Sequence, residues 1–170
     1  MPTLEDESFD IVVFAGALHH FPNQLTAISR AKNLIKPNGL IIAHEPARDS
    51  VTLGNAAFLH LLISLLNINK NFYKHQDLST DRNQLLADVN EIYNSLRYES
   101  EDLAKLQSVN DNAAGYAEMY PLLSSIFKQE RFEWRYAFFH EVIGGLRFDE
   151  EDTNTHVAHF LREIDRILVS

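Results

Sequence analysis

The sequence contains no cysteine, and this absence removes several chemistries at once. Without thiols the chain forms no disulfide, binds no metal through thiolate and uses no cysteine nucleophile. A chain without disulfides agrees with a reducing compartment, so the cytoplasm is the expected location.

Positive charge is also scarce. Lysine and arginine number 15 against 24 aspartates and glutamates, so the formal net charge is −9 at pH 7. Nucleic acids and anionic lipid surfaces are bound mainly through a basic face that neutralises their phosphates. We therefore expect no nucleic-acid partner and no anionic membrane surface.

Long hydrophobic runs are absent as well. The most apolar stretch, residues 56–66, is about half the length of a transmembrane helix, and it contains His60 and Ser64. Residues 1–7 are acidic and include no apolar run of signal-peptide length. The sequence thus predicts a soluble protein without membrane association or a targeting segment.

The length and apolar content of the chain are enough for about one domain, because it has 170 residues and a hydrophobic content of 45%.

Near the N-terminus the pattern predicts a βαβ unit. Residues 9–15 are apolar on both faces, which is typical of a strand buried on both sides of a parallel sheet. A helix over 25–35 follows, capped by Asn23 and ended by the turn 36–39. Residues 40–44 then form a second buried strand, parallel to the first.

Helices dominate the remainder of the prediction, together with one further strand. Residues 132–139 are aromatic and alternate weakly in polarity, so they predict a strand. The fold class is therefore α/β, with a small mixed sheet and a majority of helix, in a single domain over residues 1–170. The other expected segments are a helix over 56–66, a linker over 67–75, a helix carrying Leu85 to Leu96 after caps at 79–81, a short helix after Ser100, a loop over 108–112, a helix over 113–128 with a kink or break at Pro121, and a last helix over 155–169.

Two motifs flank the first helix. They are Ser8–Phe21, which reads SFDIVVFAGALHHF, and Leu34–Pro46, which reads LIKPNGLIIAHEP. Together they resemble the fourth strand, following helix and fifth strand of the class I S-adenosylmethionine-dependent methyltransferases. Asn38 stands where the family's turn has its first glycine, and asparagine tolerates the left-handed conformation. The resemblance implies a partial Rossmann-like methyltransferase fold with a helical insertion near 51–128.

The resemblance also implies the cofactor S-adenosylmethionine and methyl transfer to a small-molecule acceptor. The family holds this cofactor on a glycine-rich loop after its first strand, but the six glycines here include no Gly-x-Gly. The acidic residue that binds the cofactor ribose would likewise lie upstream of Met1. The chain is thus similar to the C-terminal, substrate-side half of such an enzyme, and we expect it to be inactive alone.

The candidate site lies at the carboxyl end of the first strand, where open α/β sheets bind ligands. By resemblance, Ala15, Gly16 and Leu18 lie beside the methionine end of the cofactor. His19 and His20 follow, and one of them is expected to contact the acceptor or take its proton, because histidine titrates near neutral pH. The alternative is that at least one of the two is structural and holds the loop.

His44 and Glu45 end the second strand at the same edge. His44 is expected to contact the substrate, and Glu45 is expected to act in catalysis by orienting the substrate or His44. In the alternative, the Glu45 carboxylate caps the loop or the next helix. Tyr116 and Tyr120 lie on a lid-like helix and are candidate substrate contacts or core residues, whereas Asp49 is expected at the surface.

Three further groups carry weaker hypotheses. The aromatic residues within 132–139 either line an acceptor pocket or, preferably, pack in the core. His140 and Glu141 are either a dyad or, preferably, a strand-end pair. His156 and His159 have a helical spacing that can bind metal, but the sequence places no third ligand, so we expect no metal.

The first predicted strand would form an uncovered edge of the sheet. It could be covered by a missing N-terminal half, by a second copy of the chain, or by a helix from residues 51–128. We expect a homodimer with the helix 56–66, the edge 9–15, or both at the interface. The alternative function is a non-catalytic methyltransferase-like remnant that acts in binding or assembly.

Overall fold

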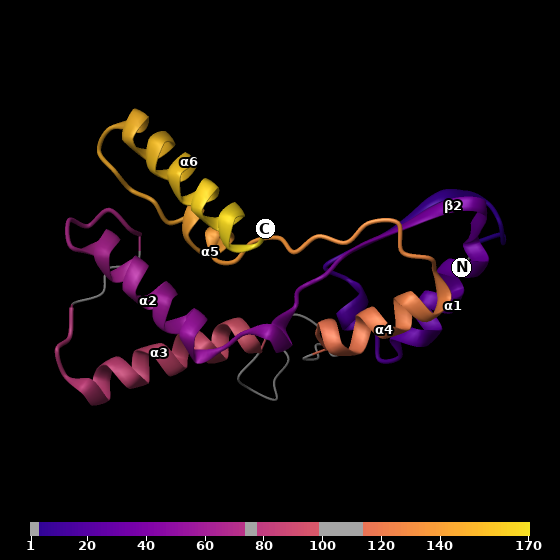
Figure 1. Ribbon diagram of the computed structural model, residues 1–170, viewed down its shortest axis with the longest axis horizontal. Coiled ribbons are helices and arrows are strands. Elements are labelled where there is room, and N and C mark those ends of the chain that lie inside the picture. The colour runs from indigo at the N-terminus through magenta and orange to yellow at the C-terminus, as the bar shows by residue number, and fades with distance from the viewer. Residues whose placement is uncertain (1–3, 74–77, 99–113) are drawn as a thin grey trace. The chain divides into compact units, whose positions relative to one another are not determined.

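The computed structural model describes residues 4–73, 78–98 and 114–170, which form two compact units. One unit comprises residues 1–51 and 94–130, and the other comprises residues 52–93 and 131–170. The described residues contain six α-helices and a two-stranded parallel sheet, so the chain is a mixed α/β protein (Figure 1).

The first unit begins with the predicted strand, helix and strand. β1 spans Phe9–Ala15, α1 spans Gln24–Leu34 and β2 spans Ile35–His44, and the two strands pair in parallel. The side-chain oxygen of Asn23 accepts a 2.9 Å hydrogen bond from the backbone N–H of Thr26, as an N-cap does. The βαβ prediction and its capping residue are therefore confirmed.

β2 starts at Ile35, earlier than predicted, because the expected turn over 36–39 is an irregularity inside the strand. Asn38 has a φ of 67° there, in the left-handed region that asparagine tolerates. Gly39 is required by close packing, since an added Cβ would lie 2.5 Å from the Ile35 side chain and 2.9 Å from the Asp10 backbone oxygen.

One face of the sheet carries the core of the first unit. Helices α1 and α4, the latter spanning Tyr116–Ile126, pack on this face. The buried residues of this core come from the sheet, the loop after β1 and both helices, and they are Phe14, Leu18, Ile28, Ala31, Ala114 and Met119.

The other face of the sheet is exposed, which corrects the prediction that both strands are buried on both sides. Ile11 pairs with Leu40 and Val13 pairs with Ile42, so these four side chains alternate onto one face. Each of them is 48–56% exposed. The apolar pattern indicated two covered faces, but among the described residues α1 and α4 cover only the opposite one.

The predicted helix over 56–66 is confirmed as α2, Leu53–Asn67. It starts earlier than expected because Thr52 and Asn55 form a capping box: the Asn55 backbone N–H donates to the Thr52 hydroxyl, and the Thr52 backbone N–H donates to the Asn55 side chain.

The other helical predictions are confirmed within the described residues. α3 spans Arg82–Arg97 and follows the cap Asp81, whose carboxylate accepts from the backbone N–H groups of Asn83 and Gln84. α4 continues through Pro121, so the helix is not broken there as one of the two predicted outcomes required. α6 spans Glu151–Leu168. The short helix expected after Ser100 and the loop over 108–112 lie outside the described residues.

The strand predicted over 132–139 is wrong. Residues 131–137 belong to no helix or strand, and α5, Phe139–Ile143, begins directly after Phe138. The backbone N–H groups of Phe138 and Phe139 donate to Oδ1 of the buried Asp165 of α6, at 2.7 and 2.8 Å, and so begin this helix. With no antiparallel strand in the described part of the chain, the sheet is purely parallel and not mixed.

The aromatic side chains of the segment before α5 divide between surface and core. Trp134 and Tyr136 are exposed, so the preferred core position is wrong for them. Phe138 is buried, and its ring lies 5.2 Å from that of Phe58 in α2.

The same segment contains a carboxyl group between two arginines. Hydrogen bonds from Arg135, and secondarily from Arg131, lower the pKa of the Glu133 carboxyl.

A short antiparallel contact joins two loops of the second unit. Phe72 bridges Leu146, and the Tyr73 backbone N–H donates to the Gly145 carbonyl at 2.9 Å. A Cβ at Gly145 would overlap the Phe72 ring, so glycine is required there. In the portion of the chain that the structure describes, no helix combines the length and apolarity needed to cross a membrane.

Candidate functional site at the carboxyl ends of the parallel strands

The loop after β1 is tied to the end of β2 by a backbone hydrogen bond. The Gly16 backbone N–H donates to the His44 carbonyl at 2.8 Å. Gly16 has a φ of 58°, a conformation that glycine adopts without steric cost. This turn directs the chain into a short 3₁₀ helix, η1, which spans Leu18–His20.

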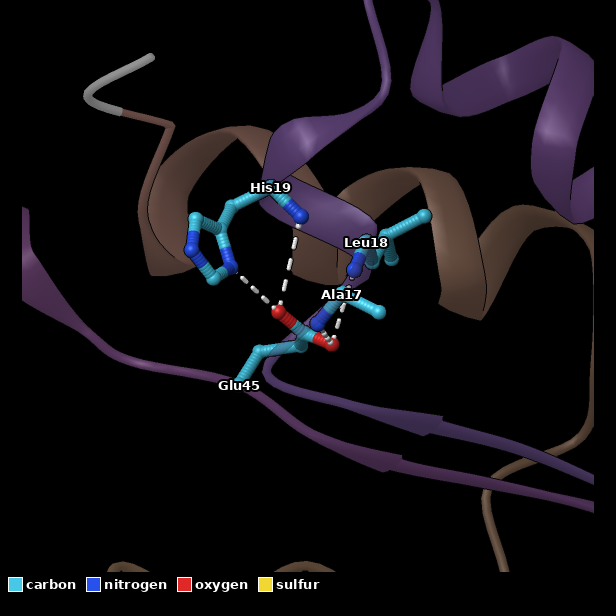
Figure 2. Close-up of polar contacts among 4 residues, drawn as sticks. All are labelled: Ala17, Leu18, His19 and Glu45. Carbon is cyan, nitrogen blue, oxygen red and sulfur yellow. Dashed lines mark hydrogen bonds and ion pairs between the residues drawn. The ribbon is translucent and has the colours of Figure 1, made fainter. Parts of the chain in front are cut away.

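The carboxylate of Glu45 holds this helix in place (Figure 2). Its Oε1 accepts from the backbone N–H groups of Ala17 and Leu18, each at 2.9 Å. Its Oε2 accepts from the His19 backbone N–H at 3.4 Å and from the His19 imidazole at 2.7 Å. One side chain thus satisfies three consecutive backbone donors that η1 leaves without an internal acceptor.

The hydrogen bond to Glu45 also defines the tautomer of His19. An ionised carboxylate can only accept, so we infer that the proton of the His19 ring lies on Nδ1, the atom that faces Oε2. His19 is only 2% exposed, and the Glu45 side chain is similarly buried. The structure therefore pairs Glu45 with His19, where the sequence hypothesis paired it with His44 or the substrate.

The two neighbouring histidines differ in exposure. His20 is half-buried, and its ring centroid lies 4.0 Å from that of His19 with the planes tilted by 38°. His44 is exposed at the end of β2. Of the adjacent pair, His20 is thus the more accessible to a ligand, while His19 is enclosed.

A second carboxylate from the same segment was missed by the sequence analysis, which expected it at the surface. Asp49 accepts from the backbone N–H groups of Tyr116 and Ala117, each at 2.8 Å, and so caps α4. Gly115 permits this approach, because a Cβ there would overlap the Asp49 carboxylate. Asp49 and its partners are 67 and 68 residues apart, so no local pattern signals the contact.

The two tyrosines predicted to contact substrate lie together on α4. The rings of Tyr116 and Tyr120 stack with centroids 4.8 Å apart and planes within 18°, and both residues are half-buried. The Tyr120 hydroxyl donates to the Gln129 side chain. Asp49 fixes the start of α4 and with it the tyrosine pair. Glu45 likewise fixes residues 16–20, which we call the histidine loop, so the segment after β2 positions both.

The three residues predicted to lie beside the cofactor have different environments. Ala15 and Gly16 are exposed, and a Cβ on Gly16 would meet no atom within 4 Å, so their backbone is open to a ligand. Leu18 is fully buried in the core, and its N–H is engaged by Glu45. Within the described residues no group of three or more histidine, cysteine, aspartate or glutamate side chains could hold a metal ion.

Comparison with known families bears on this part of the chain. Residues 1–43 match a family model described as "Methyltransferase domain". The match includes β1, the histidine loop, α1 and β2 up to its penultimate residue, and it identifies this part as a class I S-adenosylmethionine-dependent methyltransferase-like region. The resemblance drawn from the two motifs is therefore confirmed for residues 1–43. Searches of curated proteins and of solved structures gave no match.

Proposed function

We propose that this chain forms the acceptor side of an S-adenosylmethionine-dependent methyltransferase that acts on a small molecule. One observation carries the proposal: the methyltransferase-like region contains a histidine loop that Glu45 holds by hydrogen bonds at the carboxyl ends of two parallel strands. This edge is where open α/β sheets place their ligands.

The residues beside the loop suit the methionine end of the cofactor. Ala15 and Gly16 offer exposed backbone at the end of β1, and Leu18 holds the loop to the core beneath them. When bound, S-adenosylmethionine supplies the electrophilic methyl group. The six glycines of the chain include no Gly-x-Gly, so the proposal assigns no glycine-rich cofactor loop to these 170 residues.

The chain's own residues have separate tasks in this proposal. His20 accepts the proton of a hydroxyl or amine acceptor, because it is the more accessible histidine of the adjacent pair. Glu45 and His19 act as positioning residues that hold His20 through the backbone of η1. His44 and the pair Tyr116–Tyr120 contact the acceptor and align it, because an in-line displacement depends on orientation.

A non-catalytic binding or assembly role is the second candidate, and one observation favours it. Every hydrogen bond that the Glu45 carboxylate makes within the described residues serves the loop itself, so the carboxylate needs no substrate to explain its position. The loop would then have only a structural role within the methyltransferase-like region.

Titration of the ¹⁵N-labelled chain with S-adenosylmethionine tests the proposal. We expect weak binding, with a dissociation constant above about 1 μM, and shifts of the Ala15 and Gly16 amide resonances. ATP, which shares the adenosine group but lacks the methionine group, is the matched control and should leave these resonances unchanged. If millimolar S-adenosylmethionine moves no resonance of the loop, the binding or assembly role replaces the enzymatic one.

A further inference from the structure

The sequence contains one asparagine that precedes a glycine, and this pair, Asn38–Gly39, lies at the irregularity of β2. Phe9 pairs with Ile35 and Ile11 pairs with Leu40, so β1 advances by two residues while β2 advances by five. The residues between Ile35 and Leu40 therefore have no paired residue in the described sheet. Such a bulge interrupts the ladder locally and leaves its extra residues outside the strand pairing.

The backbone of the bulge selects both members of the pair. Asn38 is exposed and has a φ of 67°, a left-handed conformation that asparagine adopts more readily than most residues. Gly39 is fixed by packing, because a Cβ there would overlap the Ile35 side chain and lie 2.9 Å from the Asp10 backbone oxygen. The fold thus places an exposed asparagine directly before a residue that must be glycine.

An asparagine in this position can react with its own main chain, and asparagine is among the thermally labile residues of proteins. The Gly39 backbone nitrogen, which no Cβ shields, attacks Cγ of Asn38. The bond between Cγ and the side-chain nitrogen breaks, and that nitrogen leaves as ammonia with the proton of the Gly39 N–H. The product is a cyclic imide.

Water then opens the imide at one of its two carbonyl carbons. Attack at the former side-chain carbonyl gives aspartate, and attack at the main-chain carbonyl gives isoaspartate, in which the chain continues through Cγ. The net change in both cases is the loss of ammonia and the gain of water. Both products add one negative charge to the formal net charge of −9, but only isoaspartate lengthens the main chain, by one methylene group.

We propose that Asn38 is a site of spontaneous deamidation in the folded chain, and that its isoaspartate form weakens the pairing of β2 with β1. No ladder pair has to open before the imide forms, because the bulge already lies outside the pairing. The added methylene group enters the chain beside Gly39, whose close packing does not accept even one additional carbon. Aspartate tolerates the left-handed conformation, so Asn38→Asp should preserve the bulge.

Peptide mapping by mass spectrometry, after prolonged incubation of the 170-residue chain at mildly alkaline pH, tests the site. We expect Asn38 to exchange NH₂ for OH well before Asn69, an exposed asparagine that precedes Lys70. The rate at Asn38 in the folded chain should lie within about tenfold of its rate in denaturant, which corresponds to an opening cost of at most about 1.4 kcal/mol. Asn38→Gly is the matched control, because glycine adopts the same φ and has no side chain to react.

Hydrogen exchange then tests the consequence for β2. The isoaspartate fraction, isolated from the incubated chain, should exchange faster at Leu40 and Ile41, whereas Asn38→Asp and Asn38→Gly should exchange as the unmodified chain does. Deamidation at Asn38 slowed more than about tenfold by folding overturns the proposal, because the bulge then protects the asparagine. So do equal rates at Asn38 and Asn69, and so does an isoaspartate fraction whose β2 exchange is unchanged.

Discussion

The carboxylate of Glu45 and the imidazole of His19 are joined by a 2.7 Å hydrogen bond across 26 residues of sequence. The same carboxylate accepts from three successive backbone N–H groups of the loop that carries His19. Four hydrogen bonds to one buried side chain thus tie the loop to the residue that follows β2. The position of His20, the next residue, therefore depends on Glu45.

Replacing Glu45 by Gln should release this loop. The glutamine retains one acceptor oxygen but turns an NH₂ group toward N–H donors, so we expect the free energy of unfolding to fall by about 2 kcal/mol. Amide exchange of Ala17, Leu18 and His19 should accelerate. Asp49→Asn is the matched control, and it should accelerate exchange at Tyr116 and Ala117 instead. Equal effects of both variants at both places would contradict separate roles for the two carboxylates.

Adding one methyl group at Gly115 should remove the cap of α4. The Gly115 backbone has a φ of −126°, which alanine also adopts, so any cost comes from overlap with the Asp49 carboxylate. We expect Gly115→Ala to lose about 1–2 kcal/mol in chemical denaturation. Gly144→Ala is the control, since a Cβ there meets nothing within 4 Å, and it should lose no stability. Tolerance of Gly115→Ala would show that the cap is dispensable.

Chemical modification should separate the histidines of the site. Diethyl pyrocarbonate modifies accessible imidazoles, so it should react with the exposed His44 and the half-buried His20 before His19, which is 2% exposed. Mass spectrometry of peptides would locate each adduct. In Glu45→Ala the reaction at His19 should accelerate several-fold, while His44 should react at its original rate. Rapid modification of His19 in the unmodified chain would refute its enclosed position.

Asp165 should prove to be the main anchor of α5. Its Oδ1 accepts from two backbone N–H groups, so Asp165→Ala leaves both donors unsatisfied and should destabilise the chain by about 2–3 kcal/mol. Asp165→Asn keeps an oxygen at this position and should retain most of the stability. Thermal and denaturant unfolding of the two variants compares them directly. If asparagine costs as much as alanine, the negative charge matters more than the acceptor.

Local patterns predicted the elements of this protein well where neighbouring residues cooperate. The apolar run of β1, the spacing of α1 and the Asn23 cap all act within a few residues, and each was found as predicted. The strand predicted over 132–139 from aromatic alternation does not form. The backbone N–H groups of Phe138 and Phe139 instead donate to the Asp165 carboxylate, 27 and 26 residues away, and a helix begins at Phe139.

The sequence by itself determined the parallel βαβ unit, its methyltransferase-like motifs and the placement of His19, His20 and Glu45 at one edge of the sheet, because periodicity and chain direction are local properties. Only the tertiary structure decided which donor each carboxylate meets. Glu45 reaches the histidine loop and Asp49 reaches α4, at separations where sequence carries no periodic signal. Tertiary packing also decided which apolar faces are covered, because burial requires a partner surface that composition does not specify.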